Sequence, residues 1–129
     1  YPEGTVTRDP ELWPMVGRTG VARLALTTGC PVVPVAQWGA HEILMPYAKR
    51  PRLLPRKTIR YSAGPAVDLS EFAGEPLTAD VLRPATEKVM AAIRVLLADL
   101  RGEPAPADVW DRQLGRRIPP SSAPERWTA

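Results

Sequence analysis

An amphipathic segment, a glycine and an apolar run follow one another in this chain, and their order constrains the fold most. The apolar spacing predicts a helix over residues 18–28, which Gly29 would end in a left-handed conformation. Its inward face would carry Val21, Leu24, Ala25 and Thr28. The apolar run at 32–37 predicts a buried strand, at an edge or with a bulge because Pro34 lacks a ladder donor. Helix, glycine turn and strand form the second half of a βαβ unit, so we expect an α/β fold whose first strand precedes Tyr1, in a longer protein.

After this unit the sequence indicates an irregular stretch, a strand and a long helix. Residues 38–56 are interrupted by prolines and predict irregular structure. Polar and apolar residues alternate over 57–64, which predicts a half-buried strand with Ile59, Tyr61 and Ala63 on its apolar face. The helix would stop at Gly102 and start at Thr78 or near Arg83, since Pro84 is best tolerated in a first turn. Its apolar stripe would be Leu82, Ala85, Val89, Ile93, Leu96 and Leu100.

The carboxy-terminal part differs in composition from the rest. Residues 103–129 are rich in proline, serine and charge, without periodicity, and we expect a Pro-rich, extended or disordered tail. Trp110 and Trp127 would anchor it locally. We therefore divide the chain into residues 1–102, which form part of a folded domain, and the tail 103–129. A role of this tail as a docking segment for a partner is a further alternative.

Composition limits the classes of function. The formal net charge of +3 favours anionic partners such as phosphorylated substrates, lipid headgroups or an acyl carrier protein. A single cysteine, Cys30, excludes an internal disulfide, and we expect it to be a small buried apolar residue. One cysteine and one histidine provide no zinc-ligand spacing, so no metal is expected. No apolar run has the length of about 20 residues that a membrane-spanning helix needs.

The opening stretch Tyr-Pro-Glu-Gly-Thr places a carboxylate, a glycine and a hydroxyl close to Arg8. Gly4 allows the backbone to approach a ligand closely, and N–H groups beside a guanidinium suit the oxygens of a phosphate. The same stretch is also compatible with an ordinary surface turn. Two motifs follow it in order, Arg18-Thr19-Gly20 before the helix and Val33-Pro34-Val35 in the strand.

Together the three motifs resemble the glycerol-phosphate acyltransferase family, specifically the 1-acylglycerol-3-phosphate acyltransferases. The resemblance covers residues 1 to about 42. It implies the carboxy-terminal part of a three-layer αβα domain. It also implies transfer of an acyl group from acyl-CoA or acyl carrier protein to lysophosphatidic acid, at the cytoplasmic face of the cell membrane in phospholipid synthesis. Glycerol 3-phosphate or another lysophospholipid is an alternative acceptor. No cofactor and no nucleic-acid partner are implied.

The resemblance also assigns binding residues. The residues that would receive the acceptor's phosphate are Glu3, Gly4, Thr5, Arg8 and Arg18. The family has an arginine directly after the threonine, where this chain has Val6, so we expect Arg8 to supply that guanidinium. The residues on the acyl side would be Val33, Pro34, Val35 and Trp38, and the strand residues among them are equally compatible with a plain core strand.

No catalytic residue is expected within the chain itself. In the resembled family a His-x-x-x-x-Asp motif, upstream of the glycine turn, supplies the general base. Here His41 follows the strand and Pro46 occupies the position of the aspartate, so we interpret His41 as a loop residue. We expect the chain to lack acyltransferase activity on its own.

A basic loop supplies the remaining signal. Its cations are Lys49, Arg50, Arg52, Arg56 and Lys57, and they alternate with Tyr47, Leu53 and Leu54. This pattern favours peripheral contact with anionic lipid headgroups, although it is also compatible with a solvated loop. An alternative function for the whole chain is a non-catalytic module that binds anions, whether lipid or nucleic acid.

Overall fold

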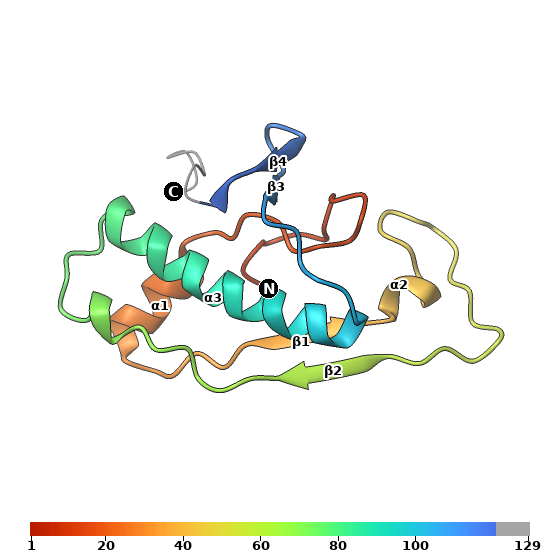
Figure 1. Cartoon of the computed structure of the whole chain (residues 1–129), viewed down its shortest axis with the longest axis horizontal. Coiled ribbons are helices and arrows are strands. Elements are labelled where there is room, and N and C mark those ends of the chain that lie inside the picture. Colours follow the sequence, from red (N-terminus) through yellow and green to blue (C-terminus); the bar gives the residue numbers. More distant parts are fainter. Residues whose placement is uncertain (121–129) are drawn as a thin grey trace.

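The computed structural model describes residues 1–120, which combine helices with short antiparallel strands (Figure 1). The elements in chain order are α1 (Gly20–Thr28), β1 (Val35–Trp38), α2 (Ala40–Ile43), β2 (Arg60–Ala63), the 3-10 turn η1 (Ser70–Phe72), α3 (Ala79–Arg101), β3 (Val109–Asp111) and β4 (Arg116–Ile118). This composition is consistent with the α/β class expected from the sequence. The three-layer arrangement stays a prediction.

The long helix α3 organises the packing. It lies across the β1–β2 sheet and beside α1 (Figure 1). Thr78 precedes it in an extended conformation, so the earlier of the two predicted starts is correct and Pro84 lies inside the helix. Gly102 ends it at φ 71°, with its N–H donating to the Ala98 carbonyl at 2.8 Å. Its fully buried residues are Leu82, Ala85, Thr86, Val89, Met90 and Leu97.

Helix α1 packs through alanines. Gly29 ends it at φ 67°, in the left-handed conformation that the sequence predicts. The buried residues are Ala22 and Ala25, whereas Leu24, expected on the inward face, is 65% exposed. Two alanines allow the helix to approach Leu82, Ala85 and Val89 of α3 closely, and this contact decides which face turns inward.

The sheet has one buried and one exposed face. β1 and β2 are antiparallel, with Val35 opposite Ala63 and Ala36 opposite Ser62. Ala36 is buried and Val35 is exposed, so the predicted buried strand is buried on one face only. It lies at an edge, as Pro34 indicated, because the sheet has two strands. In β2 the predicted phase is reversed, because Tyr61 is 64% exposed while Ser62 is half-buried opposite Ala36. A shift of one residue exchanges the two faces of a strand.

Residues 1–19 form hardly any regular structure, yet they contribute to the core. Trp13 and Met15 are buried, and Trp13 packs against Ala36 and Leu97. The Met15 backbone also forms an isolated parallel bridge with Trp110. The loop is therefore a fixed layer on α3 and the sheet.

The two last strands form a hairpin where we expected a tail. β3 and β4 pair antiparallel, and Val109, Asp111 and Ile118 are buried. The hairpin is attached to the first loop, since the Val16 N–H donates to the Trp110 carbonyl at 3.0 Å. The expectation of an extended or disordered segment is therefore wrong for residues 109–118, because they pair as a hairpin and contact the first loop through Trp110 and Arg117. Trp127 lies outside the described residues, and the division at residue 102 stays a prediction.

Candidate phosphate-binding turn

The opening turn is fixed by its backbone. The Gly4 N–H donates to the Tyr1 carbonyl at 3.1 Å, and Gly4 adopts φ 67°, a left-handed conformation that glycine tolerates best. The Arg18 N–H donates to the Pro2 carbonyl at 2.8 Å, which holds the start of α1 against the turn. A Cβ atom at Gly4 would lie 3.2 Å from Arg18 Nε, so the glycine leaves room for this side chain to lie along the turn.

Glu3 stabilises this turn from its buried side. Its carboxylate accepts a hydrogen bond from the Met15 N–H at 2.9 Å. Burial raises the pKa of Glu3, an effect that this hydrogen bond and the nearby amino terminus partly offset. The carboxylate therefore positions the turn on the first loop. Its hydrogen bond is directed into the protein, toward the Met15 N–H.

On the other side of the turn lies Tyr47, from the basic loop. Its hydroxyl accepts a hydrogen bond from Arg8 Nε at 3.2 Å and donates one to the Val6 carbonyl at 3.1 Å. The Arg8 guanidinium lies 5.8 Å from the centre of the Tyr47 ring. Tyr47 adopts φ 63°, which is uncommon for a residue other than glycine and is held here by these contacts.

Thr5 and Arg112 also act on the Tyr47 hydroxyl. Its pKa is lowered, chiefly by the hydrogen bond from Arg8, and further by a hydrogen bond from Thr5 and by the charges of Arg8 and Arg112. The turn therefore has two guanidiniums and two hydroxyls on this side. Hydrogen-bond donors and positive charge of this kind are suited to phosphate oxygens.

Sequence reasoning missed Tyr47 and Arg112 as neighbours of the turn. It assigned Tyr47 to a surface loop and Arg112 to a tail. Tyr47 meets Arg8 across 39 positions of the chain. A contact between residues so far apart in the sequence cannot be predicted from a local sequence pattern.

The two arginines predicted to bind phosphate contact different residues. Arg18 lies against Gly4, and Arg8 lies against Tyr47. None of the predicted phosphate residues lines either of two hollows in the described part of the chain. The first, of about 480 Å³, is formed by the basic loop, and the second, of about 280 Å³, lies between the end of α1 and residues 67–74. The candidate site is therefore the open surface of the turn.

The predicted acyl-side residues lie in β1 and in the two residues before it, some exposed and some buried. Val33 and Val35 are exposed, while Pro34 is buried and its carbonyl accepts the Gly64 N–H at 3.0 Å. Pro34 also lies near Leu96 of α3, since a Cβ atom at Gly64 would come within 3.4 Å of both side chains. Val33 and Val35 thus offer apolar surface to solvent, whereas Pro34 fixes the strand on the core.

Trp38, the last predicted acyl-side residue, is covered by other side chains. The Arg101 guanidinium lies 4.3 Å from its ring centre and 4.0 Å from that of Trp13. The ring of His41 lies 4.2 Å from that of Trp38. His41 belongs to α2 rather than to a loop, so that expectation is corrected.

Cys30 differs from its prediction as well. It is exposed, directly after the left-handed Gly29, and it lines the second hollow. The turn at Gly29 places the Cys30 thiol at the surface rather than in the core. Across residues 1–120, no cluster of histidine, cysteine or acidic side chains could hold a metal ion. In the same range, no helix has the length and apolarity to span a membrane.

Comparison with known proteins supports an acyltransferase family. A family model described as "Acyltransferase" matches residues 1–38. The matched segment contains the glycine turn, Arg18, α1 and β1. No curated protein and no solved structure matches the chain. The match supports acyl transfer as the general activity.

Proposed function

We propose that the chain forms the acceptor-binding part of a three-layer acyltransferase domain that acts on lysophosphatidic acid. The acyl group would come from acyl-CoA or acyl carrier protein, and the product would be phosphatidic acid. The observation that carries the proposal is the placement of Arg18 along the Gly4 turn, inside the segment that the acyltransferase family matches.

In this reaction the acceptor hydroxyl attacks the thioester carbonyl of the donor. The new ester C–O bond forms, the C–S bond breaks, and the proton of the hydroxyl passes through a general base to the leaving thiolate. His41 does not fit as this base, because its ring packs at a tilt against that of Trp38 and it lies on α2 rather than beside the turn. The described residues would contribute by holding the acceptor.

The phosphate of the acceptor would bind on the surface of the turn. Arg18 would provide a bidentate contact on one side, and Thr5 and Arg8 would bind from the other side. Each charge-assisted hydrogen bond contributes about 1.5–3 kcal/mol. Glu3 would hold the turn in place without touching the phosphate, since its carboxylate accepts from the Met15 N–H. Val33 and Val35 would contact an acyl chain with their exposed side chains.

The test is titration calorimetry of the chain with lysophosphatidic acid below its micellar concentration. We expect Arg18→Ala to weaken binding at least about tenfold, the loss of one charge-assisted hydrogen bond, and Arg18→Lys to recover part of the affinity. Arg23→Ala is the matched control, because it removes an exposed arginine from the next turn of α1. Monoacylglycerol, which lacks the phosphate, should bind weakly to all variants.

Equal affinity for lysophosphatidic acid and monoacylglycerol would contradict the proposal. So would equal losses from Arg18→Ala and Arg23→Ala. We further expect no acyl transfer by the 129-residue chain alone, and measurable transfer by it would contradict the division of roles.

The basic loop favours a second candidate, a non-catalytic module that binds anions. It predicts steep salt dependence of binding to any polyanion, without preference for a lysophospholipid. Under that function Arg18→Ala would have no more effect than the loss of any other exposed cation.

A further inference from the structure

We propose that residues 44–57 form a docking surface for an anionic lipid bilayer, which we call the docking loop. Its cations would bind lipid headgroups while Leu53 and Leu54 enter the boundary between headgroups and acyl chains. This surface goes beyond the proposed acceptor site and uses none of the residues assigned to phosphate recognition.

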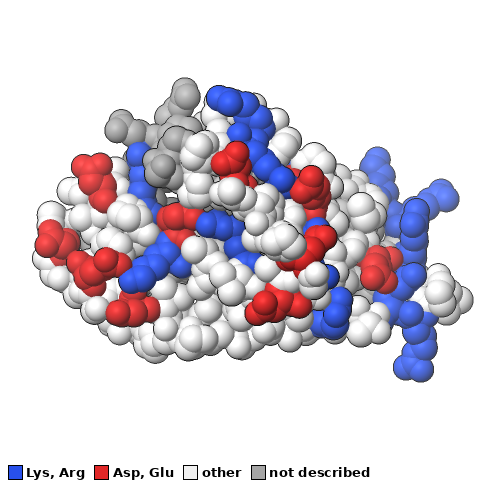
Figure 2. Space-filling model, in the orientation of Figure 1, with Lys and Arg blue, Asp and Glu red and all other residues white. Residues whose placement is uncertain are grey.

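The charge of the docking loop has one sign. Residues 43–67 contain no aspartate or glutamate, and their cations are Lys49, Arg50, Arg52, Arg56, Lys57 and Arg60. Figure 2 shows basic side chains gathered at one end of the molecule, whereas both signs are mixed over the remainder of the visible face. Ion pairs within residues 1–120 engage none of these cations. The region therefore has an uncompensated positive field that would attract an anionic surface.

Apolar side chains are exposed among these cations. Leu53 is 69% exposed and its neighbour Leu54 is 85% exposed, and Leu44 and Met45 are also exposed. Single exposed leucines are common on protein surfaces, but here adjacent ones lie beside cations on one loop. Insertion of these side chains into the interfacial region would remove apolar surface from water while the cations remain at headgroup level.

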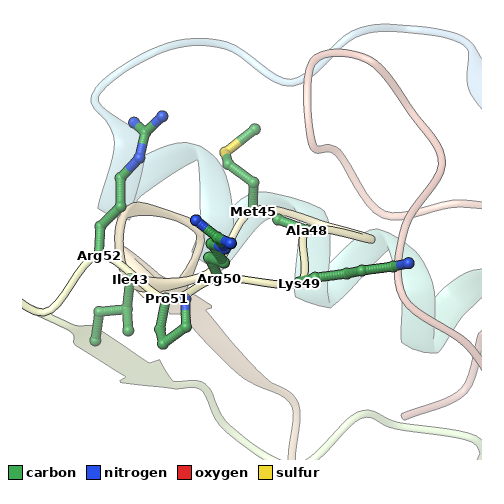
Figure 3. Close-up of a pocket in the computed structure, with 7 residues that line it drawn as sticks. All are labelled: Ile43, Met45, Ala48, Lys49, Arg50, Pro51 and Arg52. Atoms are coloured by element: carbon green, nitrogen blue, oxygen red, sulfur yellow. The ribbon is translucent and has the colours of Figure 1, made fainter.

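The loop is also shaped to receive a charged group. Lys49, Arg50 and Arg52 line the hollow of about 480 Å³, together with the apolar residues Ile43, Met45, Ala48 and Pro51. Figure 3 shows the three basic side chains pointing in different directions around the loop. A phosphodiester headgroup with its glycerol backbone complements this lining, because its anionic oxygens suit the cations and its carbon atoms suit the apolar residues.

Backbone contacts hold the loop in this shape. The Arg52 N–H donates to the Ile43 carbonyl at 2.6 Å, and the Ala48 N–H donates to the Met45 carbonyl at 3.0 Å. Tyr47 fixes the loop to the opening turn through its bonds to Arg8 and Val6. A surface that is already formed loses little conformational entropy when it binds.

A bilayer fits this surface better than a nucleic acid does. Single-stranded nucleic acids use exposed aromatic rings as stacking platforms. The aromatic residue of the docking loop, Tyr47, is 63% exposed, but Arg8 lies 5.8 Å from its ring centre and donates a hydrogen bond to its hydroxyl. Exposed leucines gain nothing from a phosphate backbone, whereas a bilayer satisfies both them and the cations.

The experiment is sedimentation of the chain with vesicles of phosphatidylcholine, with and without a minor fraction of phosphatidylglycerol. We expect binding only to the anionic vesicles, and weaker binding as salt rises. Arg50→Ala with Arg52→Ala should weaken the partition coefficient about 25-fold, or about fivefold for each cation. The matched control is Arg23→Ala with Arg116→Ala, which removes as many exposed cations from α1 and β4 and should have a smaller effect.

A second pair of variants tests the apolar contribution. Leu53→Ala with Leu54→Ala should weaken the partition coefficient about tenfold and leave its salt dependence unchanged. Leu24→Ala with Val95→Ala, which changes exposed residues on α1 and α3, should leave it unchanged. Thermal unfolding of each variant serves as a folding control.

Three results would overturn the proposal. One is equal binding to neutral and anionic vesicles, and another is equal loss from the two arginine pairs. The third is unchanged vesicle binding without Leu53 and Leu54, together with equally tight binding to single-stranded DNA, which would identify a general polyanion surface. Loss of lysophosphatidic acid binding through Arg18→Ala is a separate measurement, so the two proposals can fail independently.

Discussion

The first loop, residues 1–19, and the docking loop, residues 44–57, are both irregular, but they differ in burial. The first loop places Asp9, Trp13 and Met15 in the interior. In the docking loop, every residue from 48 to 56 is exposed. Scarcity of helix and strand therefore does not distinguish a core segment from a surface segment in this molecule.

The difference lies in how the backbone groups are satisfied. In the first loop, side chains serve as partners. Asp9 Oδ1 accepts from the Glu11 N–H at 3.0 Å, and Glu3 accepts from the Met15 N–H at 2.9 Å. Buried polar groups need such partners, and the loop that has them can be packed against α3 and still present a fixed turn. The docking loop is instead held by backbone–backbone hydrogen bonds, from the Arg52 N–H to the Ile43 carbonyl and from the Ala48 N–H to the Met45 carbonyl, and its residues 48–56 are exposed to an external surface.

The largest effect that tests this comparison is expected from Trp13. Trp13→Ala should lower the free energy of unfolding by about 3–5 kcal/mol, because it leaves a cavity beside Ala36 and Leu97 and removes a stacking partner of Arg101. Leu54→Ala should change it by less than about 0.5 kcal/mol. Urea denaturation measures both, and comparable losses would mean that the two loops do not differ.

A smaller loss of unfolding free energy is expected when the ion pair that joins the first loop to the hairpin is removed. Arg117 Nη2 lies 2.9 Å from Asp9 Oδ2 and 2.7 Å from Glu11 Oε2. Burial alone would lower the pKa of Arg117, but the hydrogen bonds and charges of Glu11 and Asp9 raise it overall.

Asp9→Ala should cost about 3 kcal/mol of unfolding free energy, because it removes a buried carboxylate and leaves its partner cation without its main contact. Glu11→Ala is the matched control, with a loss below about 1 kcal/mol, since that carboxylate is exposed. If the two variants lose equal stability, the hairpin is not held through the buried residue.

The third prediction concerns pH. Burial raises the pKa of Glu3 above its usual 4.5, so the folded state binds this proton more tightly than the unfolded state. The stabilisation that protonated Glu3 provides is fully present below about pH 4.5 and is lost as pH rises through the folded pKa. The free energy of unfolding of the unmodified chain should therefore fall relative to that of Glu3→Gln between pH 4 and pH 7. A difference that stays constant over this range would show that Glu3 is not buried.

The smallest effect is spectroscopic and reports on the contact between the two loops. The phenol of Tyr47 should titrate below the usual 10.0, and Arg8→Ala should raise its pKa by removing the main hydrogen bond. Ultraviolet titration measures the phenolate, and subtraction of the Tyr47→Phe curve isolates this residue from Tyr1 and Tyr61. An unchanged titration in Arg8→Ala would mean that the loops do not touch in solution.

Local signals predicted α1 and α3, whereas α2 lies where we expected irregular structure. Gly29 and Gly102 end α1 and α3 as expected, because a left-handed residue at a helix end is a property of glycine itself. The exposed Leu24 and the reversed phase of β2 could not be predicted, since both depend on which surface α3 covers. The hairpin was missed because a composition rich in proline and charge says nothing about the buried partners that Val109 and Ile118 find.

The candidate site was predicted in part. The match of the acyltransferase family to residues 1–38 agrees with the motifs that the sequence displays. The sequence shows Gly4 and Arg18 in two separate motifs of the resembled family, and the structure brings them together. The sequence could not show that Tyr47 and Arg112 lie near the turn, because their proximity results from the path of the chain through β1, β2 and the hairpin.

The hydroxyl of Tyr47 has a consequence for regulation, because it hydrogen-bonds both Arg8 and the Val6 carbonyl from a loop that faces outward. If adsorption on a bilayer shifts that loop, the guanidinium beside the turn must readjust, and an anion that captures Arg8 must in turn release the phenol. Thermodynamic linkage makes such an influence mutual, so adsorption and ligand affinity would change each other by the same factor. Tyr47→Phe, which keeps the ring and removes the bridge, would uncouple them.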